Sequence, residues 1–165
     1  MEIPSPLKQG MSPEEYKELF ISEYCRSRTI FLVSPDTSIR VEFRPSMFEH
    51  AFFESSDRAG AKDIFSAKRA ERMMLISSLL DDVTGERYFG WDKEAKKDNI
   101  KRCVMVHNSF DFVVVIEFFL SKSDEIRGRF ITCYVADSWD TLPKIKRHAK
   151  WDFTFLRERL AVEKK

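Results

Sequence analysis

The sequence predicts an α+β fold in which N-terminal helices precede a four-stranded antiparallel β-meander and a C-terminal helix follows it. Amphipathic stretches with helix-capping residues lie in the first half, at residues 13–27 and 66–82. Four β-rich stretches then follow one another through short polar turns. Such short links favour antiparallel neighbours, because parallel strands need crossovers of about a dozen residues or more.

The first helix has a clear start signal. Ser12 is a good N-cap, Pro13 suits the first helical position, and two acidic residues follow in the first turn. The apolar stripe of this helix consists of Tyr16, Leu19, Phe20 and Tyr24. Residues 29–33 and 38–43 are β-rich and flank a Ser-Pro-Asp-Thr turn, so they predict a hairpin.

The remaining elements follow from the same rules. Ser46 is placed to cap a short helix that carries His50, and Gly85 ends the longer helix region. The four predicted strands of the meander are residues 88–91, 101–107, 111–120 and 129–136. Residues 111–120 are apolar on both faces, as expected of a central strand. After Trp139 the pattern is helical through a basic cluster and again over residues 153–163.

Length and composition predict a single domain with a substantial core. The chain has 165 residues, of which 43% are hydrophobic and 33% charged, and 15 are Phe. The three cysteines, Cys25, Cys103 and Cys133, are widely spaced in apolar contexts. This spacing indicates reduced core thiols rather than disulfides or metal ligands.

Several classes of function are disfavoured. No stretch approaches the roughly eighteen apolar residues of a membrane helix, and the start MEIPSPLKQG does not resemble a signal peptide, so we expect a cytoplasmic protein without membrane contact. Metal-ligand spacings, P-loops and glycine-rich dinucleotide loops do not occur, so we expect no metal and no cofactor. The net charge is +1, but basic residues cluster late, at Lys144, Lys146, Arg147, His148 and Lys150. Such a run is either a phosphate-binding patch or a solvated helix face.

The last predicted strand, GRFITCYVAD at residues 128–137, carries the first candidate site residues. Side chains alternate across a strand, so Ile131, Cys133 and Val135 are expected on the core face. Thr132 and Tyr134 then share the opposite, more polar face. Both residue types also favour strands for purely structural reasons.

Two arginines of the helix at residues 66–82 fall near its apolar side. Arg69 shares the direction of Met73, Ile76 and Leu80, and Arg72 falls between Ile76 and Leu79. A guanidinium aimed at a sheet needs an acceptor or a phosphate. Alternatively, each arginine extends to solvent or pairs with a carboxylate.

These motifs occur in a recognisable order along the chain: FEHAFFE around His50, the helix SAKRAERMMLISSLLDD, and the strands FDFVVVIEFF and GRFITCYVAD. Together they resemble the phage-borne branch of the barnase–EndoU–colicin E5/D–RelE-like (BECR) nucleases. The likeness covers about residues 43–151. It implies a nuclease domain over residues 43–165, with residues 1–42 as an extension packed on it.

The resemblance also implies a function, that of a toxin-like, metal-independent endoribonuclease in which the ribose 2′-OH attacks the adjacent phosphodiester. His50 would be the general acid or base, Arg69 would stabilise transition-state charge, and Thr132 and Tyr134 would orient the phosphate or protonate the leaving oxygen. The implied partners are RNA, with tRNA among the candidates, and an immunity or antitoxin protein. Basic residues that would contact the substrate are Arg72, Lys144, Lys146 and Arg147.

Two other hypotheses fit the same residues. The first is a non-catalytic binding module of phage or mobile-element origin, in which Phe-rich strands and the late basic helix contact a protein or a nucleic acid. The second is a degenerate nuclease that keeps the fold and has lost activity. Substitution of His50 or Tyr134 would leave the function of a binding module unchanged.

Overall fold

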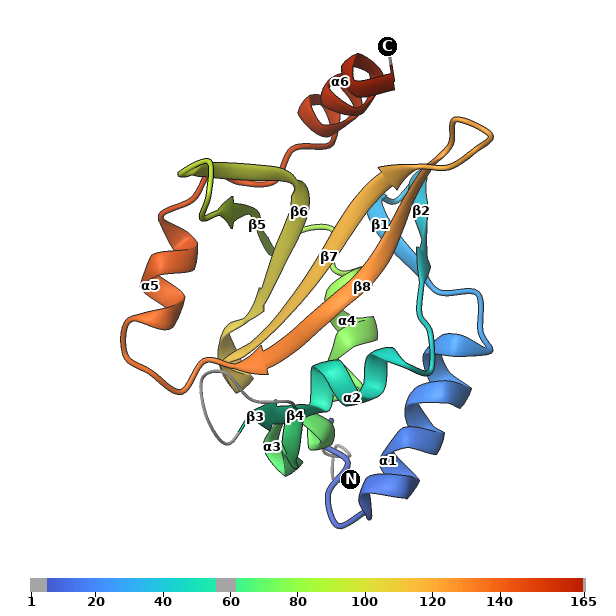
Figure 1. Cartoon of the computed structure of the whole chain (residues 1–165), viewed down its shortest axis with the longest axis vertical. Helices are drawn as coiled ribbons and strands as arrows, with labels where there is room; N and C mark the ends of the chain where they lie inside the picture. Colours follow the sequence, from blue (N-terminus) through green and yellow to red (C-terminus); the bar gives the residue numbers. More distant parts are fainter. Residues whose placement is uncertain (1–5, 56–61, 165) are drawn as a thin grey trace.

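The computed structural model describes residues 6–55 and 62–164 and shows an α+β fold (Figure 1). Its main sheet has six strands in the order β1-β2-β8-β7-β6-β5. Their bounds are Ile30–Ser34 (β1), Thr37–Glu42 (β2), Glu86–Asp92 (β5), Lys97–His107 (β6), Phe112–Leu120 (β7) and Ile126–Val135 (β8). Strands β5 to β8 form the expected antiparallel meander. The predicted four-stranded antiparallel sheet is nevertheless wrong in extent, because two further strands continue it.

The two additional strands come from the predicted N-terminal hairpin. β1 and β2 pair antiparallel, and β2 then pairs in parallel with β8 through Val41 with Gly128 and Glu42 with Arg129. Ile39 and Val41 of β2 are buried, so the hairpin contributes to the same core. The sheet is therefore mixed, and the long chain between β2 and β8 serves as the crossover that a parallel pair requires.

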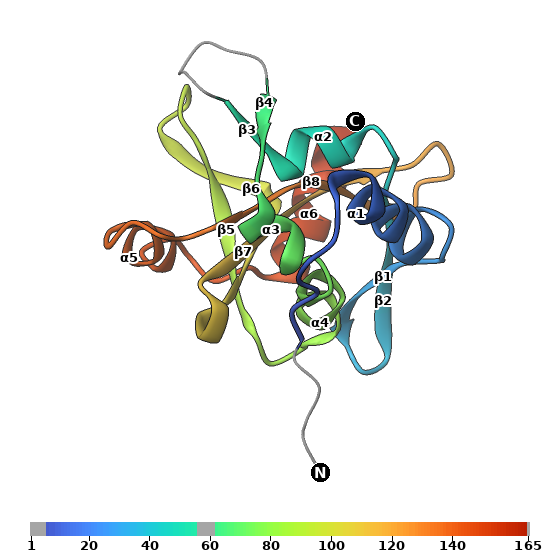
Figure 2. The ribbon, with the colours of Figure 1, turned by 90° about the horizontal axis from the view of Figure 1, so that it is seen from below.

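Most helices pack on one face of this sheet, and α5 lies apart from α1 and α4 (Figures 1 and 2). The helices are α1 (Pro13–Phe20), α2 (Met47–Phe52), α3 (Ala67–Glu71), α4 (Leu75–Asp81), α5 (Thr141–Lys146) and α6 (Phe153–Lys164). The predicted start of α1 is confirmed, since the Glu15 amide donates to Ser12 Oγ and the Ser12 amide donates to Glu15 Oε1. A π-helical turn, Ile21–Cys25, extends α1.

The predicted helix at residues 66–82 is two helices, α3 and α4. Between them the Arg72 and Met73 amides bond three residues back, as in a tight 3₁₀-like turn. Partners from elsewhere take up nearby carbonyls, because Tyr24 Oη donates to Met73 O at 2.7 Å and the Lys8 amide donates to Glu71 O at 2.9 Å. These long-range contacts explain why a continuous helix was a wrong expectation.

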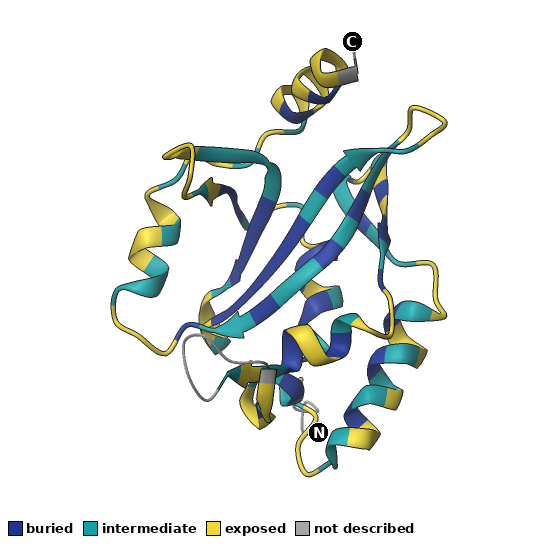
Figure 3. Ribbon diagram, in the orientation of Figure 1, coloured by how far each residue is buried: buried dark blue, intermediate teal, exposed yellow. Residues whose placement is uncertain are grey.

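The core is divided by the sheet into a large and a small part. The main core lies between the sheet and helices α1 to α4, and Leu156 and Leu160 of α6 belong to it as well. It is rich in aromatic rings, such as Phe20, Phe48 and Phe130. On the opposite side, which we call the second face, a smaller cluster contains Val104, Val113, Val115 and Ala136, with Leu142 and Ile145 of α5 against it. The central strand β7 is accordingly buried on both faces over residues 112–116, whereas buried residues of β8 are interspersed with partly buried ones (Figure 3).

The edge of β8 that faces away from β7 pairs with β2 over only part of its length. The pairs with β2 reach only to Arg129, and α2 packs against β8. A two-stranded ribbon, β3 (Phe53–Ser55) and β4 (Lys62–Phe65), then leads from α2 to α3. The sequence of residues 54–62 is polar and contains Gly60, which predicts a loop; the structure has strands at both ends of this segment, and residues 56–61 lie outside the described chain.

Candidate functional site

A β-bulge at Ile131 decides which β8 side chains reach the second face. Phe130 pairs with Ile116 and Thr132 pairs with Val115, so Ile131 is the additional residue. Phe130 therefore lies in the main core together with Cys133, whereas Ile131 packs on the second face. Strict alternation predicts Phe130 on the face of Thr132 and Tyr134, and Ile131 on the face of Cys133, so it was wrong for both residues. It was correct in separating Thr132 and Tyr134 from Cys133.

Arg69 lies at the corner where α2, α3 and β8 meet. Its Nη1 donates to Ala51 O at 3.1 Å, and its Nη2 lies 3.3 Å from Glu54 Oε1. The side chain is 15% exposed, and its Nε is buried without a hydrogen-bond partner within residues 6–55 and 62–164. A guanidinium held here by one carbonyl and one exposed carboxylate keeps donors available for a further acceptor.

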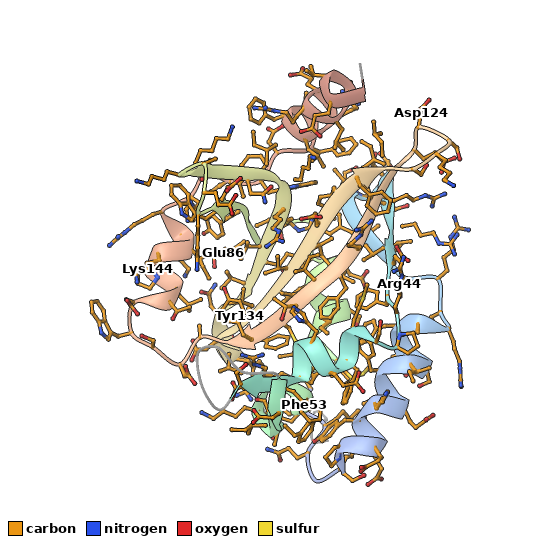
Figure 4. The ribbon with its side chains drawn as sticks, in the orientation of Figure 1. Arg44, Phe53, Glu86, Asp124, Tyr134 and Lys144 are labelled. Carbon is orange, nitrogen blue, oxygen red and sulfur yellow. The ribbon has the colours of Figure 1, made fainter. Side chains whose placement is uncertain are left out.

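Tyr134 lies close enough to Arg69 for the two groups to interact electrostatically. Burial raises the pKa of the Tyr134 phenol, and the positive charge of Arg69 partly opposes this rise. The phenol consequently stays protonated at neutral pH and is a hydrogen-bond donor. Figure 4 shows Tyr134 at the end of β8 near α2.

Thr132 and His50 are held less firmly. The Thr132 hydroxyl donates to Cys133 O at 3.4 Å, a weak bond that another acceptor can replace. His50 is exposed on α2, directly before Ala51, whose carbonyl Arg69 binds. The structure thus has Arg69 and Tyr134 within electrostatic range of each other, and Thr132 lies on the same face as Tyr134. His50 is exposed on α2, and within the described chain no contact joins its side chain to Arg69, Thr132 or Tyr134.

The four basic residues expected to bind substrate have different surroundings. Arg72 uses its donors within the protein, with Nε bonded to Phe110 O at 3.2 Å and Nη1 to Lys68 O at 2.8 Å. The other three lie on or directly after α5, which packs against the second face through Leu142 and Ile145. Figure 4 shows Lys144 on this helix. The two lysines pair with neighbouring polar groups: Lys144 with Asp140 at 2.8 Å, and Lys146 with Asn108 at 2.7 Å and Glu86 at 3.6 Å.

These pairs also affect acidities on that side of the molecule. The hydrogen bond from Lys144 lowers the pKa of Asp140 to about 2. A hydrogen bond from Asn108 is the main reason that the pKa of Glu86 is lowered, with Lys146 adding to the effect. Arg147 is exposed. Lys144, Lys146 and Arg147 therefore form a solvent-accessible basic rim at one side of the second face.

Sequence reasoning did not find a row of charges that crosses the second face. Glu42, Arg129, Glu117 and Arg102 are neighbours on β2, β8, β7 and β6. Arg102 Nε lies 3.0 Å from Glu117 Oε2, and the Arg129 guanidinium lies 4.4 Å from the Phe119 ring centroid. Their alternate positions along each strand are visible in the sequence, but only the strand register brings them together.

The cysteines match the expectation of reduced thiols. All three are free, and Cys103 and Cys133 are completely buried, which raises the pKa of both thiols. Cys25 is half-buried. Within the described chain, no three His, Cys, Asp or Glu side chains are grouped so that they could hold a metal ion.

Helices long and apolar enough to cross a membrane are not found among residues 6–55 and 62–164. Comparison of the chain with models of protein families, with curated proteins and with solved structures finds no match. The likeness to BECR nucleases accordingly depends on the sequence motifs alone.

Proposed function

We propose that the protein is a metal-independent endoribonuclease whose site lies where α2, α3 and β8 meet. The observation that carries this proposal is the Arg69 guanidinium, which is largely buried, lies within electrostatic range of the Tyr134 phenol and has a buried Nε without a partner in the described chain. A phosphate oxygen is a good acceptor for such a guanidinium. On the side of α5 the basic rim is partly compensated, because Asp140 and Glu86 pair with Lys144 and Lys146, and Arg147 is left exposed.

The chemistry follows from these groups. The 2′-oxygen attacks the adjacent phosphorus and loses its proton to a base, the bond from phosphorus to the 5′-oxygen breaks, and the leaving oxygen gains a proton. The products are a 2′,3′-cyclic phosphate and a 5′-hydroxyl. His50 is the candidate base or acid, Arg69 stabilises charge on the phosphoryl oxygens, and Tyr134 and Thr132 donate hydrogen bonds or the leaving-group proton.

A binding function without cleavage is the second candidate, and one observation favours it. His50 is exposed on α2, and none of the described residues hydrogen-bonds to its ring. Catalytic imidazoles are usually oriented by a second group. In a binding module the same arginines and lysines would hold RNA, and no chemical step would follow.

Cleavage of structured RNA in the presence of EDTA tests the proposal. We expect products with 2′,3′-cyclic phosphate ends, and a loss of rate on the order of 10²–10³ for His50→Ala or Arg69→Gln. Tyr134→Phe should also reduce the rate, whereas its matched control Tyr88→Phe and the control His148→Ala should not. Intact RNA after long incubation with excess protein would contradict the proposal, as would wild-type rates for His50→Ala and Arg69→Gln.

The proposed toxicity and the proposed RNA substrate both depend on this ribonuclease activity. An active, toxin-like ribonuclease arrests growth when it is expressed without its immunity partner, and tRNA is a natural first substrate to sequence for cut ends. Growth arrest by the wild type that His50→Ala abolishes would support the toxin proposal. Equal toxicity of both proteins would instead favour the binding module.

A further inference from the structure

A pocket of about 400 Å³ lies at the junction of β2, β8 and the segment after α1. It is lined by side chains of several kinds, including Arg40, Arg127, Phe119, Cys25 and Ser27. Its volume falls in the range of pockets that hold small organic ligands, about 300–1,000 Å³. Arg127 and Tyr134 are seven residues apart on β8, roughly 20 Å along a strand. The pocket is therefore separate from the proposed cleavage site.

Two arginines that line this pocket occupy neighbouring positions on adjacent strands. Arg40 and Arg127 each directly precede a member of the parallel pair Val41 and Gly128. Like charges in such positions destabilise a sheet. Positions where a sequence breaks a local rule of this kind are often functional.

The nearby carboxylates leave this charge only partly compensated. Glu42 Oε1 accepts a hydrogen bond from Arg44 Nε at 2.5 Å, so it is already paired. Glu125 lies 2.6 Å from Arg127 Nη2, but it is 60% exposed, and such surface pairs contribute little. Arg40 has no ion pair with any residue in the described parts of the chain. The net charge at the pocket is thus positive, and the ligand it fits is an anion.

The pocket also offers an aromatic surface next to these charges. Phe119 pairs directly with Arg127 across β7 and β8, so both side chains point to the second face. Phe119 is half-buried, and the Arg129 guanidinium is 4.4 Å from its ring centroid. An aromatic ring beside guanidiniums suits a ligand that combines a flat base with a phosphate, because the base stacks and the phosphate accepts forked hydrogen bonds.

We propose that this pocket binds a nucleoside phosphate, with the phosphate between Arg40 and Arg127 and the base against Phe119. The site goes beyond the proposed cleavage and does not depend on it. Two kinds of ligand carry both a base and a terminal phosphate: a free nucleotide and the phosphorylated end of an RNA strand. Both present a terminal phosphate and a base at the same spacing.

Calorimetric titration of the full chain distinguishes these sources. The probes are adenosine 5′-monophosphate, adenosine, inorganic phosphate and a 5′-phosphorylated RNA tetranucleotide, all added to the His50→Ala variant so that cleavage does not interfere. We expect the monophosphate to bind at least tenfold more tightly than adenosine or phosphate. Saturable binding of the tetranucleotide but not of the monophosphate would support the site and identify the strand end as its source.

Substitutions of the residues that line the pocket test whether the ligand binds there. Arg40→Gln and Arg127→Gln should each weaken binding about tenfold or more, the loss expected for one charge-assisted hydrogen bond. Phe119→Leu should weaken the binding of the nucleotide but not the binding of inorganic phosphate. Arg157→Gln is the matched control, because this guanidinium also lies over a ring, 5.5 Å from the Phe153 centroid, but on α6.

A second readout is the stability of the free protein. Arg40→Gln removes one of two like charges, so it should leave the urea midpoint unchanged or raise it. A lower midpoint would indicate that Arg40 is structural and would overturn the proposal. Equal affinity for phosphate and the monophosphate, no saturation by any probe at millimolar concentration, or unchanged binding by Arg40→Gln and Arg127→Gln would overturn it as well.

Discussion

Arg87 is a buried cation, and its replacement by Met should destabilise the protein more than the loss of an exposed arginine does. The residue is 8% exposed. Its guanidinium donates to three backbone carbonyls, Leu32 O at 2.6 Å, Leu80 O at 3.1 Å and Leu79 O at 3.3 Å. It thereby joins β1 to the C-terminal end of α4, where the negative end of the helix dipole favours a cation.

The magnitude follows from these contacts. Each hydrogen bond from a charged donor contributes about 1.5–3 kcal/mol. The guanidinium also lies 4.0 Å from the centroid of the Phe31 ring. Burial opposes these gains, as the lowered pKa of Arg87 indicates. Met fills similar space without desolvating a charge, so we expect a net loss of about 3 kcal/mol, a large part of the 5–15 kcal/mol typical of a domain.

Urea unfolding followed by circular dichroism measures this loss. The midpoint should fall while the slope stays constant, since the surface exposed on unfolding is similar. Arg44→Met is the matched control: this exposed arginine pairs with Glu42, and such a surface pair contributes at most about 1 kcal/mol. If Arg87→Met lost no more than Arg44→Met, the carbonyl contacts would not stabilise the fold as argued.

Three further predictions concern stability. Burial raises the pKa of Tyr24 to about 12. Because this pKa exceeds the value near 10 in the unfolded chain, the contribution of Tyr24 to the free energy of unfolding is fully present below pH 10. As the pH rises toward 12, the free energy of unfolding falls by up to about 3 kcal/mol. Tyr24→Phe should remove this dependence when urea unfolding is measured as a function of pH. Ser12→Ala breaks the capping box of α1 and should reduce the unfolding free energy by about 1 kcal/mol, with wild-type stability as the contrary result. Gly90→Ala places a Cβ 2.9 Å from Arg102 Cβ and should lower the melting temperature, with a loss of about 1–3 kcal/mol, and more than Gly128→Ala, whose nearest contact is 3.2 Å.

Features set by neighbouring residues could be predicted from the sequence. The cap at Ser12, the hairpin around residues 34–37 and the meander from β5 to β8 all depend on local patterns, and the structure contains each of them. The apolar stripe of the first helix is also largely correct, since Tyr16, Phe20 and Tyr24 are buried. These elements need only short-range turn chemistry and periodicity.

Features set by distant residues could not be predicted. The parallel pairing of β2 with β8 joins segments far apart in the chain, and neither strand carries a local signal of its partner. The break between α3 and α4 depends on the Tyr24 hydroxyl at Met73 O. The same limit applies to the second face, because Arg129 and Glu117 become neighbours only through register.

The candidate site was predictable in its residue types more than in its geometry. Helical periodicity indicated that Arg69 turns toward the sheet, and the structure has this side chain 15% exposed. The same periodicity did not separate Arg69 from Arg72, although Arg72 bonds to Phe110 O and Lys68 O instead. Their difference arises because the helix ends at Glu71, so Arg72 no longer follows the helical rotation.

The bulge at Ile131 relates the pairing of β2 with β8 to the position of the candidate site. In a strand without the bulge, Phe130 and Cys133 would lie on opposite faces because they are three residues apart, so the bulge allows both side chains to enter the main core. Bulges also bend and twist a strand. Here the last pair with β2, Glu42 with Arg129, ends just before the bulge, and α2 packs against β8. The bulge therefore marks where the pairing of β8 with β2 gives way to the corner that holds Arg69 and Tyr134, and it separates that corner from the Arg40–Arg127 pocket.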